Sequence, residues 1–96
     1  MHTEPLSVPP VRVALLGAGH LGKIHLKCLL ELPERFHVVG VYDPDPSALA
    51  KAVEVFGVPG YDQPEPLMDL VDAVDIVAPT LSHYDLALMA LRRLKH

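Results

Sequence analysis

Three glycines with a fixed spacing are the residues of this sequence that point most directly to chemistry. Gly17, Gly19 and Gly22 form the pattern G-x-G-x-x-G within the segment GAGHLG. In a turn from a strand into a helix, the first glycine permits the tight bend and the second lets a phosphate approach the backbone. The third lets the helix pack closely on the strand. The free N–H groups and the positive dipole end at such a helix start bind anions, so the pattern predicts a phosphate-binding loop.

One acidic residue follows the glycines at the distance typical of a ribose-binding acid. Asp43 ends the apolar segment HVVGVY and comes about 20 residues after Gly22. Its carboxylate would accept hydrogen bonds from the adenosine ribose hydroxyls, and its charge would repel a 2′-phosphate. The next residues, Pro44, Asp45 and Pro46, bring no cation to offset that repulsion. We therefore expect NAD to be favoured over NADP.

Three other interpretations of the glycine pattern predict a different ligand or none. A Walker phosphate loop needs Gly-Lys-Ser/Thr, but Lys23 is followed by Ile24. A methyltransferase nucleoside loop more often has G-x-G-x-G with an acid just before it, whereas leucines precede this loop and Leu21 takes the place of its last glycine. A glycine-rich turn that binds no nucleotide stays open as the third interpretation.

Alternating strands and helices must position these residues. The predicted strands are residues 11–16, 37–42, 58–61 and 74–78. The predicted helices are residues 20–32, 46–56, 66–71 and 83–94. Asp45 is expected to cap the second helix with Pro46 at its first position, and Ser82 with Asp85 to form a capping box at the last helix. This alternation predicts an α/β fold, a doubly wound parallel sheet in three layers.

Apolar residues at helical spacing mark the faces expected to be buried. In the first helix these are Leu21, Ile24, Cys28, Leu29 and Leu32. In the third they are Leu67, Leu70 and Val71, and in the last Tyr84, Ala87, Leu88 and Leu91. The single cysteine, Cys28, is accordingly interpreted as a buried, inert thiol.

Composition limits the function classes. The chain has 96 residues, half of them apolar, with 8 Lys and Arg against 12 Asp and Glu. This acidic balance argues against nucleic-acid binding, and no apolar run approaches the roughly 20 residues of a membrane span. One cysteine excludes an internal disulfide and suits a reducing compartment, so a cytoplasmic protein is expected. Residues 1–10, with three prolines, are expected to form a flexible leader before a single domain at 11–96.

From the glycine loop onward, the sequence resembles the Gfo/Idh/MocA oxidoreductases, the family of glucose-fructose oxidoreductase and inositol dehydrogenase. GAGHLGKIH at residues 17–25 looks like the family's G-x-G-x-x-G-x-x-H. VVGVYDP at 38–44 looks like its second strand and Asp-Pro turn, and VDIVAPT at 74–80 followed by His83 looks like its D-I-V-x-P-T-x-x-H. The resemblance covers residues 11–96 almost without gaps.

The resemblance implies a Rossmann-type domain, of which this sequence would be the incomplete first half, with the strand order 3-2-1-4-5-6. It implies that the cofactor-binding residues are Gly17, Gly19, His20, Leu21, Gly22, Asp43, Pro79, Thr80, Leu81 and His83. The glycines, with the backbone of His20 and Leu21, would form the dinucleotide loop. Residues 79–81 would line the nicotinamide side, and His83 would lie near the cofactor ribose or pyrophosphate.

Family members transfer a hydride between NAD(P) and a hydroxyl of a sugar, nucleotide sugar or cyclitol. They continue with a strand ending in Glu-Lys-Pro, whose lysine acts at the substrate, and with a second domain that supplies the acid/base. Because the sequence ends at His96, before both, we expect no catalytic residue here and no dehydrogenase turnover from these residues alone. The alternative is a non-catalytic nucleotide-binding or self-associating Rossmann module.

Two further expectations concern metals and assembly. The six histidines show no i, i+4 pair on a helix and no acid or cysteine cluster beside them, so no metal site is expected. Without a fifth strand, residues 74–78 would form an apolar sheet edge, and such edges pair with other chains. A homo-oligomer is therefore expected.

Overall fold

A computed structural model describes the backbone of residues 8–77 and 80–93, and the side chains of all of these except 80–82. Strands and helices alternate along the chain as predicted. The elements are β1 (Val11–Leu16), α1 (His20–Leu30), β2 (Phe36–Tyr42), α2 (Pro46–Phe56), β3 (Gly60–Tyr61), α3 (Pro64–Met68), β4 (Ala73–Ile76) and α4 (Thr80–Arg92). In the described part of the chain, no helix combines the length and the apolar character needed to cross a membrane.

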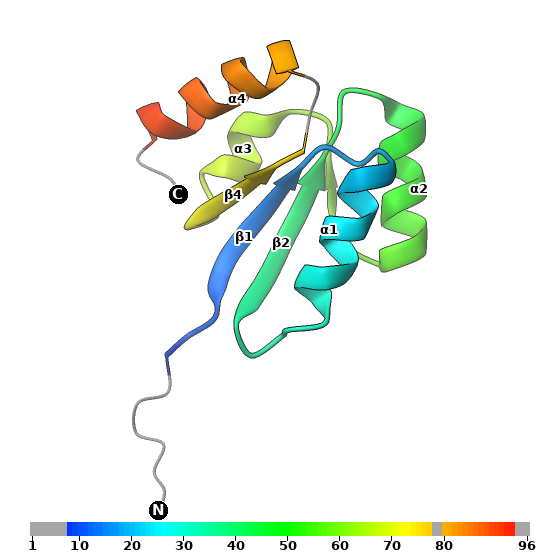
Figure 1. The fold of residues 1–96 in the computed structure, drawn as a ribbon, viewed down its shortest axis with the longest axis vertical. Coiled ribbons are helices and arrows are strands. Elements are labelled where there is room, and N and C mark those ends of the chain that lie inside the picture. Colours follow the sequence, from blue (N-terminus) through cyan, green and yellow to red (C-terminus); the bar gives the residue numbers. More distant parts are fainter. Residues whose placement is uncertain (1–7, 78–79, 94–96) are drawn as a thin grey trace, which may run out of the picture.

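The four strands form one parallel sheet in the order β3-β2-β1-β4. Figure 1 shows α1 and α2 on one face of this sheet and α3 and α4 on the other. The doubly wound, three-layer architecture and the first four strands of the predicted order are therefore confirmed. Because the chain returns from β3 to the far side of β1, the order reverses between β1 and β4, and the loops after these strands lie side by side.

Alternate residues of β1 face the two sides of the sheet, and both sides are buried. Val13 and Leu15 pack in the core below α1 and α2, with Leu26 and Ala52 among their neighbours. On the other face, the core below α3 and α4 consists of Ala14, Leu16, Leu67, Met68, Val71, Leu86 and Ala90. A short strand covered by helices on both faces explains why the VRVALL segment is almost continuously apolar.

The predicted buried face of α1 is wrong except at Leu29, because the other four predicted residues, Leu21, Ile24, Cys28 and Leu32, are exposed. Leu21 is 55% exposed, and Ile24 and Cys28 are also exposed, so the interpretation of Cys28 as a buried thiol fails. The residues that face the sheet are Gly22 and Leu26, with Leu29 packed against the same core. Gly22 has no side chain, so the helix backbone can approach the sheet at this position. A search for apolar side chains at helical spacing passes over a glycine and therefore predicts the wrong face.

The last helices also differ from the prediction in their bounds and faces. The α4 helix begins at Thr80, so Ser82, predicted as its cap residue, lies inside the helix. Tyr84 and Leu91 are exposed, whereas Leu86 and Ala90 are buried. The helix therefore packs on the sheet through a stripe next to the predicted one. The α3 helix starts two residues earlier than expected. Leu70, which was predicted to be buried, follows the helix and is exposed.

Two side-chain contacts join β4, or the residue before it, to the elements beside it. Asp72, just before β4, accepts two hydrogen bonds from the Arg12 guanidinium, at 3.2 and 2.8 Å, and this pairing raises the Arg12 pKa. Asp75 of β4 lies 2.8 Å from Nδ1 of His25 on α1. Parallel pairing with β1 places β4 at the end of the described sheet, where it leaves one strand edge unpaired in the described part of the chain.

Candidate functional site

Two of the three loop glycines are required by the fold itself. Gly17 follows β1 with φ +123°, a conformation that side chains rarely adopt, and a Cβ there would overlap the carbonyl oxygen of Val77. A Cβ at Gly22 would overlap the carbonyl oxygen of Gly17. Gly17 thus permits the tight turn, and Gly22 lets α1 pack against that turn. Both roles are those predicted from the spacing.

Gly19 differs from the other two glycines. It is the N-cap of α1, with extended backbone at φ −72° and ψ −163°, and a Cβ there would meet no atom within 4 Å. The α1 helix has no side-chain cap and no acid in its first turn. The first turn of α1 therefore presents backbone N–H groups, with the positive end of the helix dipole, to open space.

Asp43, at the end of β2, faces this turn. One carboxylate oxygen, Oδ2, accepts a hydrogen bond from the backbone N–H of Ala18 at 2.7 Å. The other, Oδ1, accepts from the backbone N–H of Asp45 at 2.8 Å. Asp45 in turn caps α2, because its Oδ1 accepts from the N–H of Ser47 at 3.0 Å and Pro46 takes the first helical position. The predicted cap of α2 is confirmed.

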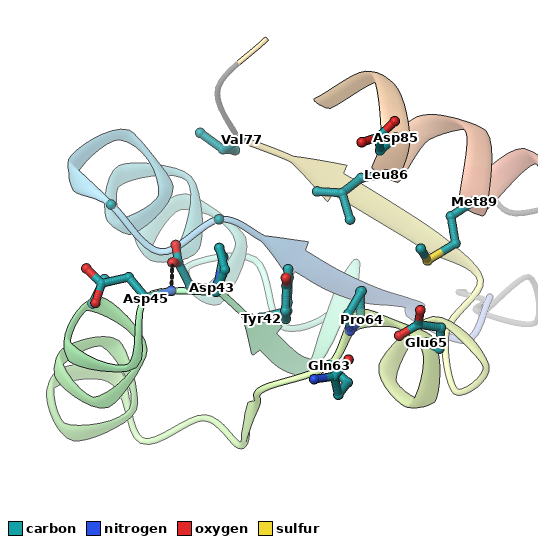
Figure 2. Close-up of a pocket in the computed structure, with 14 residues that line it drawn as sticks. Tyr42, Asp43, Asp45, Gln63, Pro64, Glu65, Val77, Asp85, Leu86 and Met89 are labelled. Atoms are coloured by element: carbon teal, nitrogen blue, oxygen red, sulfur yellow. Dashed lines mark hydrogen bonds between the residues drawn. The ribbon is translucent and has the colours of Figure 1, made fainter. Parts of the chain in front are cut away.

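A cavity of about 630 Å³ lies at the carboxyl ends of the strands, in front of the glycine turn. Figure 2 shows Asp43 and Asp45 on one side of the cavity, and Asp85, Leu86 and Met89 of α4 on the opposite side. Gln63, Pro64 and Glu65, at the start of α3, lie along a third side. Position at the carboxyl ends of parallel strands, where the strand order reverses, is where open α/β sheets bind ligands.

The cavity wall is acidic. Four carboxylates line it, those of Asp43, Asp45, Glu65 and Asp85, and none of its described lining residues is Lys or Arg. Tyr42 shows the effect of this environment, because burial first, and then the charges of Asp43 and Glu65, raise the pKa of its phenol. The first turn of α1 is thus the positive end of an otherwise negative cavity. In the described part of the chain, no group of three or more His, Cys, Asp or Glu is placed to hold a metal.

The predicted site residues fall into three groups. Gly17, Gly19 and Asp43 line the cavity. The others with described side chains do not line it: His20, Leu21 and His83, which are exposed, and Gly22, which is buried behind the turn. Pro79 lies outside the described residues, as do the side chains of Thr80 and Leu81.

Sequence reasoning missed the wall formed by α3 and α4. Gln63 and Glu65 follow β3, and the carboxyl ends of parallel strands share one edge of the sheet, so their position beside Asp43 was available from the strand order. Asp85 was interpreted as a capping residue and instead faces the cavity (Figure 2). Met89 gave no signal in the sequence beyond its place on a helix.

The parallel sheet, the glycine turn and the acid after the second strand define a dinucleotide-binding class of fold. Residues 11–96 match the family model described as the oxidoreductase family with an NAD-binding Rossmann fold. The chain belongs to this family, the Gfo/Idh/MocA oxidoreductases. Its members include NAD-dependent dehydrogenases of sugars and nucleotide sugars.

Relatives and solved structures agree with this assignment. Glucose-6-phosphate 3-dehydrogenase of Bacillus subtilis is 27% identical over 85 residues, which are 88% of this chain and 24% of that enzyme. The structure of UDP-N-acetylglucosamine 3-dehydrogenase from Acidithiobacillus ferrooxidans matches with a TM-score of 0.82 and 28% identity, over 91% of this chain and 28% of that one. Scyllo-inositol dehydrogenase of Lactobacillus casei, solved with bound NAD(H) and scyllo-inositol, matches with a TM-score of 0.79 and 26% identity, over 91% and 26%. The chain thus spans about a quarter of the length of these proteins.

Proposed function

We propose that this chain binds NAD, in preference to NADP, as the cofactor-binding segment of an oxidoreductase that acts on a sugar-type hydroxyl. One observation carries the proposal: in the described part of the chain, no atom beyond the local backbone lies within 4 Å of a Cβ at Gly19, and Gly19 and Asp43 line one cavity. A glycine at which the described residues leave room for a Cβ is explained by a ligand that comes close to its backbone.

The roles of the residues follow from this placement. The dinucleotide pyrophosphate would lie over Gly19, held by the backbone N–H groups of His20 and Leu21 at the start of α1. Each Asp43 oxygen already accepts one hydrogen bond and keeps a second acceptor site, so the carboxylate can take both ribose hydroxyls of adenosine. A 2′-phosphate would meet the charges of Asp43 and Asp45, which supports the preference for NAD.

The nicotinamide end would extend toward the start of α4. Val77 donates its N–H to the carbonyl of Leu16 at 2.8 Å, so the loops after β4 and β1 start side by side. Pro79, Thr80 and Leu81 follow in the sequence, and we propose them for the nicotinamide side, with His83 toward the cofactor ribose or pyrophosphate. When bound, the cofactor supplies the hydride acceptor, and this chain binds and orients it.

The relatives indicate the substrate class. Their names specify a sugar phosphate, a nucleotide sugar and a cyclitol, all of which carry ring hydroxyls that a dehydrogenase oxidises. We propose a substrate of this class for the oxidoreductase. We propose that these residues bind the cofactor and do not by themselves turn over a sugar-type substrate. Sugar-dependent NADH production by the pure chain would contradict that expectation.

Calorimetric titration of the chain with NAD, NADP and S-adenosylmethionine tests the ligand. The expected result is binding of NAD, with NADP at least about tenfold weaker because of the acids around the ribose position. Tighter binding of S-adenosylmethionine would instead support a methyltransferase-like nucleoside site. Loss of all binding would support a glycine turn with a structural role only.

The edge of β4, which no described strand pairs, favours a second property, self-association. This strand is the last of the described sheet. Beside it, α1 contacts β4 through His25 and Asp75 and carries two exposed apolar residues, Leu21 and Ile24. We propose a homodimer through this edge or through α4. This holds both for an oxidoreductase segment and for the alternative, a non-catalytic module. Light scattering at high micromolar concentration should show the dimer, and a monomer would contradict it. The exposed single thiol of Cys28 supports a reducing, cytoplasmic location.

A further inference from the structure

We propose that Asp43 is a positioning residue of the glycine turn, in addition to the ribose role above, on which this inference rests. The carboxylate is already engaged without a ligand, because Oδ2 accepts from Ala18, the residue between Gly17 and Gly19. Recognition of the ribose alone does not account for this hydrogen bond to the turn. At 2.7 Å, this charge-assisted bond has the length expected for a strong one.

The Ala18 amide has no alternative partner in water. Ala18 is fully buried, with 0% of its surface exposed. A buried N–H that loses its acceptor costs far more than an exposed one, because nothing replaces the bond. Asp43 thus supplies the acceptor that a turn of this shape needs.

The end of β2 holds both peptides that flank Gly17. The N–H of Gly17 donates to the carbonyl of Tyr42 at 2.8 Å, and the N–H of Ala18 donates to Asp43. With both peptide planes fixed, the turn has one direction into α1 despite the freedom of Gly17. The first N–H groups of α1, proposed to hold the pyrophosphate, inherit that direction.

The same carboxylate also reaches the next loop. Its Oδ1 accepts from Asp45, the residue that caps α2. One side chain therefore holds the loop after β1 and the loop after β2, which are adjacent walls of the cavity. Removal of Asp43, for instance to admit a 2′-phosphate, would loosen the pyrophosphate loop as well as the ribose site.

Amide hydrogen exchange in the unliganded full chain tests this directly. In Asp43→Ala, we expect exchange at Ala18 to be at least about tenfold faster than in the original chain. Asp43→Asn keeps the shape but has one acceptor oxygen, so either Ala18 or Asp45 should lose protection. Asp45→Ala is the matched control, because it removes the acceptor for Ser47 and leaves Ala18 protected. Unchanged protection of Ala18 and Asp45 in both Asp43 variants would overturn the proposal.

A nucleotide without ribose hydroxyls separates positioning from ribose recognition. ADP and 2′,3′-dideoxy-ADP are titrated into the original chain and into Asp43→Ala. Binding is followed by the NMR chemical shifts of the backbone amides. If Asp43 positions the turn, the variant binds both nucleotides several-fold more weakly. Equal binding of 2′,3′-dideoxy-ADP by the two chains would show a ribose role only and overturn the proposal. If the original chain binds neither nucleotide, the proposed function fails, while the exchange experiment still decides the positioning role.

Discussion

The helices α1 and α2 start at the same edge of the sheet, and their first turns are built differently. The α2 helix has an aspartate cap, Asp45, that bonds the N–H of Ser47, and a proline at its first position. The α1 helix begins at Gly19 with no side-chain cap and no acid in its first turn. Both helices follow neighbouring central strands. The difference shows that α2 satisfies its start within the chain, whereas α1 leaves its start open toward the cavity.

The glycines before α1 divide in the same way. Gly17 and Gly22 are needed because side chains there would overlap backbone atoms. Gly19 is not needed by any such contact. The fold therefore explains two of the three glycines, and the ligand proposed above explains the third.

The largest expected effect is a loss of folding in Gly17→Ala. The new Cβ would overlap the carbonyl oxygen of Val77, and the residue would keep an unfavourable positive φ. We expect the free energy of unfolding to fall by at least about 3 kcal/mol, measured by urea denaturation. Gly57→Ala is the control, because Gly57 also has a positive φ but open space around it, so its cost should be near 1 kcal/mol. Equal effects of the two substitutions would contradict the packing role of Gly17.

A smaller effect is expected from removal of the α2 cap. Asp45→Ala deletes the acceptor for the Ser47 N–H and should lower the free energy of unfolding by about 1 kcal/mol. Asp45→Asn keeps an acceptor oxygen and should stay close to the original chain. Thermal denaturation followed by circular dichroism compares the three proteins. If Asp45→Ala unfolds at the original temperature, the helix start of α2 does not depend on its cap, and the contrast with α1 weakens.

The smallest effect concerns the acidic wall in front of α1. Burial, followed by the charges of Asp43 and Glu65, raises the pKa of Tyr42. The neutral phenol therefore stabilises the fold. This stability is complete below the Tyr42 pKa of the unfolded chain, about 10, and is lost as the pH rises through the higher pKa of the folded chain. Ultraviolet absorbance of tyrosinate, compared between the original chain and Tyr42→Phe, measures this. Glu65→Gln should lower the pKa, and ionisation of Tyr42 at or below its ordinary pKa would count against the acidic wall.

Local chemistry made part of this structure predictable from the sequence. The glycine spacing, the acid after the second strand and the Asp45-Pro46 helix start each depend on a few neighbouring residues. The alternation of elements predicted the parallel sheet, and the family resemblance implied its strand order. The buried faces of α1 and α4 were not predictable in this way. Apolar residues lie on more than one side of each helix, and in α1 the contact stripe includes Gly22.

The far wall of the cavity depends on contacts between distant segments. The return of the chain from β3 across the sheet to β4 brings Asp85 and Met89 to the cavity in front of the glycine turn. No short pattern records that meeting. The bond from Ala18 to Asp43 also joins residues 25 apart, and spacing alone predicted the ribose role of Asp43 but not its contact with the turn.

The affinity of Gly19→Asp for NAD, measured by calorimetry beside its unfolding temperature, tests the open start of α1 most directly. Aspartate suits the extended backbone at this N-cap and would give α1 the cap that α2 has, so stability should be kept or rise slightly. The new side chain would fill the space proposed for the pyrophosphate and repel it, so binding of NAD should be lost. Unchanged NAD affinity in a folded Gly19→Asp chain would contradict the proposal that this helix start holds the dinucleotide.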